Sequence, residues 1–302
     1  MFRLLLFSLL SYSTLGELRS STPHWDYQRH GPDAWPHVFD ACEGDAQSPV
    51  DIHTSHVKYD SHLAPLLMNS YTTSNTISVW NFTHNGHTII AYPSPLSRLS
   101  ISGASLLEVY YLVNVHFHWG YHPYHGSEHT IDSTKFPLEV HFVHEARSPN
   151  TYAVLSVLFT LQRHDNEQLN DLLSIVNQTI NASVWNEYRF DVSRLFPTTS
   201  TKHFFLYNGS FTVPPCTEGI TWIVLAKHVP ISVDQLEVFS GNSVPSNFRS
   251  PQKLSSRTIL ADFEPEPYEG ESSHGTPHST ANHARISIFS LSIIIVSFST
   301  NY

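Results

Sequence analysis

Two segments of the chain alternate apolar and polar residues with the period of a β-strand, and this alternation constrains the fold most strongly. Successive side chains of a strand point to opposite faces. In YYLVNVHFHW, residues 110–119, one face is apolar or aromatic and carries Tyr111, Val113, Val115, Phe117 and Trp119. The other face carries Asn114, His116 and His118. In PLEVHFVHEA, residues 137–146, the apolar face carries Leu138, Val140 and Phe142, and the other carries Glu139 and His141. Both segments are predicted to be strands that bury one face and gather imidazoles on the other.

The rest of the chain is predicted to be mainly β, with a few helices. Short runs rich in Val, Ile, Tyr and Phe recur between turn residues and indicate strands, namely ISVWNF, HTIIAY, YAVLSVLFTL, HFFLYNGSF and ITWIVL. Helical spacing occurs in DNEQLNDLLSIVNQTI, and SVDQLEVFSG opens with a capping box of Ser232 and Gln235 and closes at Gly241. Few connections are long enough for helical crossovers. A single-domain α+β fold with a mostly antiparallel sheet is therefore expected.

Composition limits the classes of protein to which the chain can belong. Of its 302 residues 40% are hydrophobic and only 14% are charged, which supplies a sizeable core and excludes a disordered chain. The net charge is −10 and no dense block of Lys and Arg occurs, so no nucleic-acid partner is expected. Residues 20–263 are expected to form one domain. Residues 264–285 are acidic and rich in Pro and Ser, which predicts a stalk.

Both ends of the chain carry the patterns of processing signals. Residues 1–16 combine one cation with a short Leu- and Phe-rich run, which predicts a secretory signal peptide; a buried first helix is the alternative. Residues 286–302 begin with the hydrophobic run ISIFSLSIIIVSF, which is too short for a bilayer span. With the polar spacer and the small pair Ser272-Ser273 before it, the tail predicts replacement by a GPI lipid; a membrane-inserted tail is the alternative. The protein is expected at the extracellular face of the plasma membrane.

The chain has two cysteines, Cys42 and Cys216. In a chain that enters the secretory pathway, the simplest expectation is that they form one disulfide bond.

The histidines of the two alternating segments are predicted to bind a metal ion. If the strands are neighbours, His116, His118 and His141 converge on one point, about 2 Å from each nitrogen. Three neutral imidazoles leave one tetrahedral position vacant, which is typical of catalytic rather than structural zinc. Each ligand histidine needs an acceptor for its other ring nitrogen. Asn114 and Glu139 lie on the same faces to supply one.

Two other interpretations of this pattern stay open at this point. A single histidine in a strand is usually an ordinary core or surface residue. Cupin-type metal sites also use H-x-H, but they place a carboxylate ligand three or four residues further on. Here Glu128 follows His118 by ten residues, so we expect it to support the site rather than to bind the metal.

Across nearly the whole predicted domain, the chain resembles the α-class carbonic anhydrases. The matching stretches follow the order of the family, and they are HWDY, QSPVDI, NGH, HFHWG, GSEHTID, LEVHFVH, SFTVPPC, TWIVL and NFR. The resemblance implies a ten-stranded, largely antiparallel twisted sheet with a conical cavity and a zinc ion at its base. With the predicted lipid anchor, the chain is most similar to the membrane-anchored extracellular members.

The resemblance also implies roles for individual residues. His116, His118 and His141 would bind zinc, Glu139 would support His141, and Thr212 with Glu128 would orient the attacking oxygen. His87 would be the proton shuttle, and Tyr27 would help to order water in the cavity. The positions that line the apolar side, where CO2 rests, are Val143, Ile220 and Trp222, with Phe211 and Val213 beside them. Cys42 and Cys216 occupy the positions of the disulfide found in secreted members.

Three residues depart from the pattern of the family. Asn114 stands where Gln is usual and is one methylene shorter, so its hydrogen bond to the first ligand is expected to be strained or bridged by water. Val213 replaces a common Thr. Phe211 replaces the usual Leu and should narrow the pocket. Active but not maximal CO2 hydration and altered sulfonamide affinity are therefore expected.

Three functions are compared. The first is a zinc lyase that interconverts CO2 and bicarbonate and binds sulfonamide-type inhibitors. The second is a catalytically weak or inactive surface binding module on the same scaffold, but such relatives typically lose ligand histidines. The third is a zinc hydrolase of another fold, against which the absence of an H-E-x-x-H motif counts.

Four N-x-S/T sequons occur in the chain. Asn81, Asn177 and Asn181 are candidate glycosylation sites on an extracellular surface. Asn208 lies four residues before Thr212 and is expected to be too close to the cavity to carry a glycan.

Overall fold

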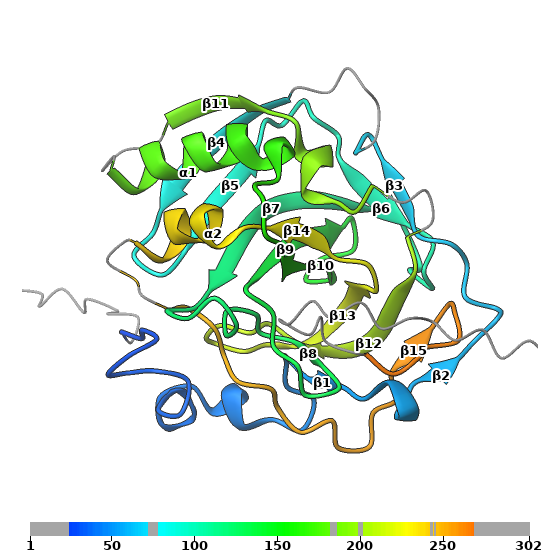
Figure 1. The fold of residues 1–302 in the computed structure, drawn as a ribbon. Helices are drawn as coiled ribbons and strands as arrows, with labels where there is room; N and C mark the ends of the chain where they lie inside the picture. The colour runs from blue at the N-terminus through cyan, green and yellow to red at the C-terminus, as the bar shows by residue number, and fades with distance from the viewer. Residues whose placement is uncertain are drawn as a thin grey trace, which may run out of the picture. The chain divides into compact units, whose positions relative to one another are not determined.

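A twisted β-sheet forms the centre of the molecule in the computed structural model (Figure 1). The structure describes residues 24–71, 78–181, 186–198, 202–241, 244 and 246–268. Within these residues the sheet has 13 strands, and its main path follows the order β11-β4-β5-β7-β9-β10-β13-β12-β15-β2. The short strands β3, β6 and β14 join beside this path, and β1 and β8 form a separate pair. The predicted mainly β fold is confirmed, and three short strands extend the expected ten.

The strands of the first half are β1 (Asp51–Ile52), β2 (Lys58–Tyr59), β3 (Leu67–Asn69), β4 (Ser78–His84), β5 (Ile89–Pro93), β6 (Ser100–Ser102), β7 (Tyr110–Trp119), β8 (Thr130–Ile131) and β9 (Leu138–Ala146). Those of the second half are β10 (Tyr152–Leu161), β11 (Asn186–Phe190), β12 (Phe204–Ser210), β13 (Glu218–Leu225), β14 (Val229–Ile231) and β15 (Leu260–Ala261). Most neighbours pair antiparallel, but β10 runs parallel to β13 and to β14, and β15 runs parallel to β2. The sheet is therefore mixed.

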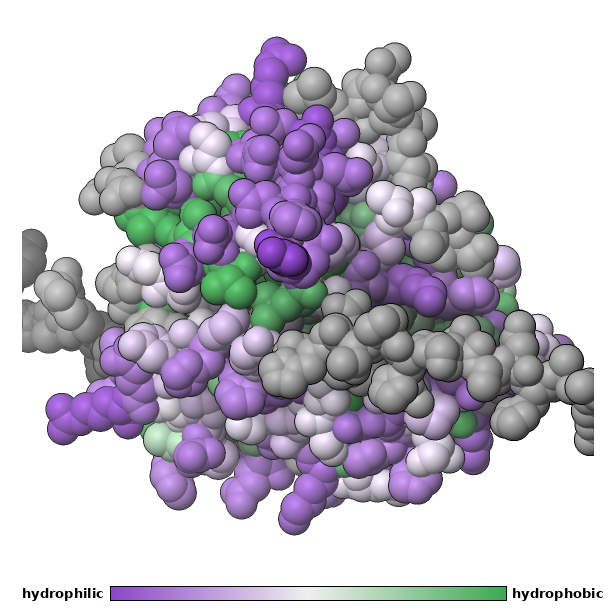
Figure 2. Space-filling view, viewed as in Figure 1, coloured by the Kyte–Doolittle hydropathy of each residue, from purple (hydrophilic) through white to green (hydrophobic). Residues whose placement is uncertain are grey.

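Two α-helices cover one face of the sheet. Helix α1 (Asn170–Asn181) packs on β4 and β5 and contacts α2 (Val233–Ser240) (Figure 1). The capping box predicted at the start of α2 is present: Ser232 Oγ accepts from the backbone N–H of Gln235, and Gly241 is the C-terminal cap. Figure 2 shows a mostly hydrophilic surface on this side, with hydrophobic colour mainly beside the two helices.

The apolar side chains of the two sheet faces form separate clusters. Phe117 and Trp119 of β7 join Phe239 of α2 in the larger cluster, which the helices cover. Val143 and Trp222 belong to a second cluster on the opposite side of the sheet. The histidines of β7 alternate with Phe117 and Trp119, so they face toward this second cluster.

A β-bulge changes the predicted alternation in β7. The register with β9 shifts between Leu112 and Asn114, so Val113 is left without a partner residue on β9. Before the bulge the buried residue is Tyr110, whereas Tyr111 and Val113 are 36% and 37% exposed. The prediction that Tyr111 and Val113 lie on the buried face is therefore wrong, because one extra residue reverses the faces of a strand.

The chain remains packed for several residues beyond the expected end of the domain. The backbone N–H of Tyr268 donates to Asp132 Oδ2 over 2.8 Å, and its ring lies 5.3 Å from the ring of Phe136. The first residues of the predicted stalk, up to Tyr268, thus lie against the domain. The predicted signal peptide, the pair Ser272-Ser273 and the hydrophobic tail fall outside the described residues.

No helix in the described part of the chain is both long and apolar enough to cross a bilayer.

Candidate active site

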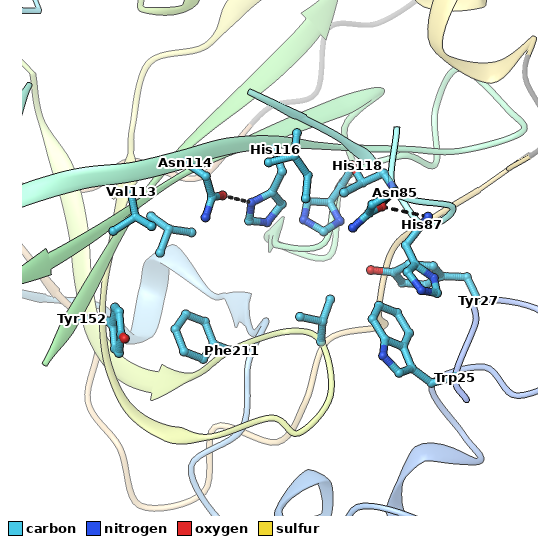
Figure 3. Close-up of a pocket in the computed structure, with 14 residues that line it drawn as sticks. Trp25, Tyr27, Asn85, His87, Val113, Asn114, His116, His118, Tyr152 and Phe211 are labelled. Atoms are coloured by element: carbon cyan, nitrogen blue, oxygen red, sulfur yellow. Dashed lines mark hydrogen bonds between the residues drawn. The ribbon is translucent and has the colours of Figure 1, made fainter. Parts of the chain in front are cut away.

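Strand pairing brings three histidines together at the centre of the sheet. In the antiparallel register of β7 and β9, His116 lies opposite His141 and His118 lies opposite Glu139. One ring nitrogen from each of His116, His118 and His141 lies within 4.8 Å of one from each of the others. Figure 3 shows His116 and His118 projecting from β7 into the same cavity. Non-consecutive segments therefore supply a set of three imidazoles.

The second nitrogen of each ring has an oxygen acceptor. His116 Nδ1 donates to Asn114 Oδ1 over 3.0 Å, and His141 Nε2 donates to Glu139 Oε1 over 2.7 Å. His118 Nδ1 donates to the carbonyl oxygen of Asn247 over 2.8 Å. These bonds fix the tautomers, because a nitrogen that faces an oxygen acceptor must carry the proton. The remaining nitrogen of each ring keeps its lone pair for a metal ion.

This donor set fits a zinc ion. His118 Nε2 is buried and has no hydrogen-bond partner among the described residues, which is unusual for a buried polar atom. Burial also lowers the pKa of all three rings, that of His116 well below its usual range and that of His118 to about 4. The imidazoles are therefore neutral at pH 7, the form that binds zinc.

The hydrogen bond between Asn114 and His116 is direct and is not bridged by water. The sequence predicts a strained or water-bridged contact, whereas the two side chains meet directly at 3.0 Å. Asn114 follows the bulge immediately. A direct hydrogen bond corrects that prediction.

Glu139 connects the zinc-binding face to the core. Its Oε1 accepts from His141, His129 and Ser156, and its Oε2 accepts from the backbone N–H groups of Glu128 and His129. Burial tends to raise the pKa of Glu139, but its interactions with His129 and His141, including these hydrogen bonds, hold it well below its usual range. Glu139 is thus an ionised carboxylate in the core, and His129 is a satisfied core residue.

Glu128 lies directly beside the histidines. Its Oε2 is 3.5 Å from His118 Nε2 and 3.8 Å from His141 Nδ1, and its Oε1 accepts from the backbone N–H of Arg249 over 2.8 Å. Burial raises the pKa of Glu128 to about 7, and this rise is opposed by His141 and by the hydroxyl of Thr212. A glycine makes this placement possible, because a Cβ at Gly126 would lie 1.8 Å from the Pro137 carbonyl oxygen.

Thr212 lies in a loop that a disulfide bond fastens. The loop follows β12, and Thr212 itself is only 4% exposed. Cys42 and Cys216 form the predicted disulfide, and the backbone N–H of Cys216 donates to the Val213 carbonyl. Arg249 strengthens this region, because its guanidinium donates to the Cys42 carbonyl and to Gln47 Oε1. The position of Thr212 is thus tied to the N-terminal segment.

His116 and His118 line a cavity of about 340 Å³. On one side Phe211 and Tyr152 stand across from β7, with their rings 5.3 Å apart (Figure 3). Val143 and Val213 complete this apolar side. The cavity therefore joins a polar row of imidazoles to an apolar wall, an arrangement that suits a small apolar molecule next to a metal.

Comparison with known proteins identifies the family. The model of the eukaryotic-type carbonic anhydrases matches residues 30–263. Carbonic anhydrase 3 of Homo sapiens is 32% identical over 263 residues, which cover 80% of this chain and 98% of that protein. Carbonic anhydrase 3 of Equus caballus is 34% identical, and carbonic anhydrase 1 of Mus musculus is 35% identical over 262 residues.

The chain belongs to the eukaryotic-type carbonic anhydrase family.

Membership of this family makes the chain a carbonate dehydratase, a lyase that acts on CO2 and bicarbonate. Of the residues implied by the carbonic anhydrase pattern, the cavity lining includes Tyr27, His87, His116, His118, Val143, Phe211 and Val213, whereas His141, Glu128 and Thr212 are not part of it. Ile220 and Trp222 are also not in its lining; they are 2% and 1% exposed. Trp222 instead packs behind His141, with their ring centres 4.8 Å apart.

His87, the expected shuttle of a carbonic anhydrase, lies at one end of the cavity. It is half-buried and stacks on Trp25, with ring centres 3.8 Å apart and an angle of 10° between the planes. Burial lowers the pKa of His87, and the nearby His24 contributes to the same direction. Tyr27 lines the same end (Figure 3).

Several residues of the site had no role in the sequence prediction. Asn247 accepts from His118 through its carbonyl and holds the backbone of Trp119 through Oδ1. Arg249 positions Glu128 through its backbone N–H. Both belong to the NFR stretch, which matches the carbonic anhydrase pattern. That match did not indicate which residues Asn247 and Arg249 contact. Val113 and Trp25 also line the cavity.

The sequons fall in different settings. Asn177 is exposed on α1, and Asn81 is half-buried within β4. The side chain of Asn181 lies outside the described residues. Asn208 is exposed on β12 and lines a different pocket from that of the histidines. Glycosylation of Asn81, Asn177 and Asn181 stays a prediction, whereas the expected closeness of Asn208 to the histidine cavity is corrected, because Asn208 does not line it.

Proposed function

We propose that this carbonic anhydrase is a zinc enzyme that reversibly hydrates CO2 to bicarbonate and a proton at the extracellular surface of a membrane. The observation that supports this most strongly is the set of three neutral imidazoles, each with its second nitrogen hydrogen-bonded to oxygen. An inactive binding module would have no need to keep this set together with Glu128 and Thr212.

In this proposal, His116, His118 and His141 hold the zinc ion. Bound zinc supplies a nucleophile at neutral pH, because it lowers the pKa of water to about 7. Glu128 and Thr212 orient the attacking oxygen, since the backbone N–H of Arg249 fixes one oxygen of the carboxylate and leaves the other facing the histidines. The hydroxyl of Thr212 interacts with the carboxylate of Glu128.

The apolar wall accommodates CO2 and excludes water from it. Val143, Phe211 and Val213 offer no hydrogen-bonding side-chain atoms, so a linear apolar molecule displaces water there at little cost. His87 accepts the released proton at the other end of the cavity, because an imidazole can take up and release protons near neutral pH. We expect this transfer to pass through water, because His87 does not belong to the cluster of three histidines.

The experiment that tests the activity is stopped-flow CO2 hydration by the purified full chain. We expect turnover that disappears when zinc is removed by a chelator and returns when zinc is restored. His118→Gln should abolish both turnover and stoichiometric zinc, whereas His62→Gln, which changes an exposed histidine, should preserve both. Turnover that survives complete zinc removal would contradict the proposal.

The proposed location is supported by the Cys42–Cys216 disulfide, because such bonds persist in oxidising compartments. We infer that the chain enters the secretory pathway and exchanges its hydrophobic tail for a GPI anchor. Treatment of expressing cells with a phosphatidylinositol-specific phospholipase should release the enzyme. Retention on the cells would favour a membrane-inserted tail instead.

A further inference from the structure

We propose that His24, Asp26 and His30 form a second metal site, separate from the histidine triad, that binds a divalent transition-metal ion such as Zn²⁺. The three residues belong to the N-terminal segment before Trp35, and none of them is part of β7 or β9. One ligand atom from each lies within 4.8 Å of those of the other two. The site would present two imidazoles and one carboxylate.

The spacing of the donor atoms matches the size of the ion. A tetrahedral zinc ion with ligands at about 2.0–2.1 Å holds neighbouring donor atoms about 3.3 Å apart. Asp26 Oδ2 lies 3.2 Å from His30 Nδ1. These two atoms can therefore bind the same ion after only small side-chain rotations.

The arrangement of the His24 and His30 rings can be compared with that of the three histidines proposed to bind the catalytic zinc ion. The rings of His116, His118 and His141 have centres 4.5 to 5.2 Å apart and planes at 51° to 88°. The rings of His24 and His30 have centres 5.4 Å apart and planes at 81°. The second pair is thus arranged much as the pairs of the triad are.

Backbone contacts hold this segment in a closed turn. Asp26 Oδ1 accepts from the N–H groups of Gln28 and His30, which leaves Oδ2 directed toward the ring of His30. The indole N–H of the buried Trp35 donates to the carbonyl oxygens of Asp26 and His30. The turn therefore brings Asp26 and His30 together before any ion binds.

Charge and exposure favour a cation from solvent. The site carries one carboxylate and two imidazoles, and its side chains reach solvent: His30 is 52% exposed and Asp26 is 29% exposed. Two nitrogen donors and one oxygen donor favour Zn²⁺, Ni²⁺ or Cu²⁺ over Mg²⁺ and Ca²⁺, which prefer oxygen alone. Trp25, which lies between His24 and Asp26 in the chain, stacks on His87, so the site lies at the rim of the cavity.

A comparison with a third cluster of the same residue types shows why the arrangement matters. His129, Glu139 and His141 also lie close together, but they are fully buried, and Glu139 is hydrogen-bonded to both histidines. His129 bonds to Glu139 through Nδ1 and contacts the Tyr207 hydroxyl through Nε2. That cluster is a buried hydrogen-bond network, whereas the ring of His24 is exposed and Asp26 Oδ2 contacts only the ring of His30 among the hydrogen bonds of the described residues.

The test is a titration of the purified full chain, first loaded with zinc and dialysed, with further Zn²⁺ against a chromophoric chelator. Wild type is expected to bind one more Zn²⁺ per chain, with micromolar affinity, than the amount retained after dialysis. Affinity for this ion should fall by about tenfold or more in His24→Gln and in Asp26→Asn. Asn keeps the oxygen that organises the turn and replaces the ligating one, and thermal unfolding will show that both variants are folded.

The matched control is His62→Gln. His62 Nδ1 lies 3.2 Å from Asp60 Oδ1, the same separation as in the proposed site, but this pair belongs to none of the three-ligand clusters among the described residues. It should bind the additional Zn²⁺ as wild type does. Equal binding by wild type, His24→Gln and Asp26→Asn would overturn the proposal, as would the absence of an additional ion in wild type. Zinc retained after dialysis reports the triad, so failure of this site is distinguishable from failure of the proposed enzyme.

Discussion

Phe211 and Val213 determine the width and the polarity of the cavity wall next to the three histidines. The ring of Phe211 packs against Tyr152, and Val213 offers methyl groups where a hydroxyl is common in the family. We expect Phe211→Leu with Val213→Thr to raise kcat/KM for CO2 hydration and sulfonamide affinity by up to about tenfold, because changes of one group in a pocket have effects of this size.

Stopped-flow hydration and inhibitor titration measure these two effects. Tyr121→Leu is the matched control, since Tyr121 is an aromatic residue that is 73% exposed and does not line the cavity. If the double variant and the control both behave as wild type does, Phe211 and Val213 do not limit the site.

Among the described residues, Asn114 supplies the side-chain oxygen that accepts a hydrogen bond from His116 Nδ1. Asn114→Ala removes this acceptor, and we expect zinc affinity to fall 10- to 100-fold, the effect that loss of such a partner usually has. Competition with a chelator of known affinity measures the change. Asn85→Ala, which alters another amide of the cavity lining, should leave zinc affinity near that of wild type.

At the scale of single elements, β7 shows what period-two patterning can and cannot predict. The pattern correctly placed His116 and His118 opposite Phe117 and Trp119, because this part of the strand pairs regularly with β9. It failed at Val113, because a bulge is one extra residue in the pairing and leaves no sign in the alternation of a single strand. The consequence is functional, since the bulge turns Val113 into the cavity.

Helix α2 was predictable in detail because its signals are local. Ser232 Oγ accepts from the N–H of Gln235, and the same hydroxyl donates to Asp165. We expect Ser232→Ala to lower the free energy of unfolding by about 1 to 2 kcal/mol, because the helix loses its N-terminal cap. Denaturant unfolding measures this. Ser174→Ala, an exposed change within α1, should alter stability by less than about 0.5 kcal/mol.

For the molecule as a whole, buried neutral histidines make stability depend on pH. Burial lowers the pKa of His144 to about 3, against 6.5 for an exposed histidine. Its Nδ1 donates to the Phe142 carbonyl, and its Nε2 accepts from the Tyr71 hydroxyl. Below pH 6.5 the unfolded chain binds a proton that the folded chain refuses. The stability due to this group is therefore complete above pH 6.5 and decreases as the pH falls toward 3, by on the order of 5 kcal/mol in all.

The prediction is that His144→Gln is less stable than wild type at pH 7 but loses less stability between pH 6.5 and pH 4. Gln offers an acceptor to Tyr71 and does not titrate. Chemical unfolding at several pH values measures the slopes. His122→Gln, in an exposed loop, should keep the wild-type slope. An unchanged slope in His144→Gln would show that other groups cause the acid sensitivity.

The parts of the site that could be predicted from the sequence are those that lie in regular, paired strands. The three histidines and Glu139 lie in two strands whose sequences alternate regularly at these positions. Their closeness could therefore be predicted from the single assumption that the two strands are neighbours. Asn247 and Arg249 reach the site from more than a hundred residues further along the chain, in a segment without regular structure. Their contacts depend on the path of a loop, which neither spacing nor periodicity specifies.

The bond between Cys42 and Cys216 has a consequence for how the protein withstands proteases. It joins positions 174 residues apart, and the exposed loop around Tyr121 lies between them. A cut in that loop would place His118 and His141 on different pieces, yet both pieces would stay covalently attached. Nicked molecules would therefore migrate as a single species until a thiol reductant separates them.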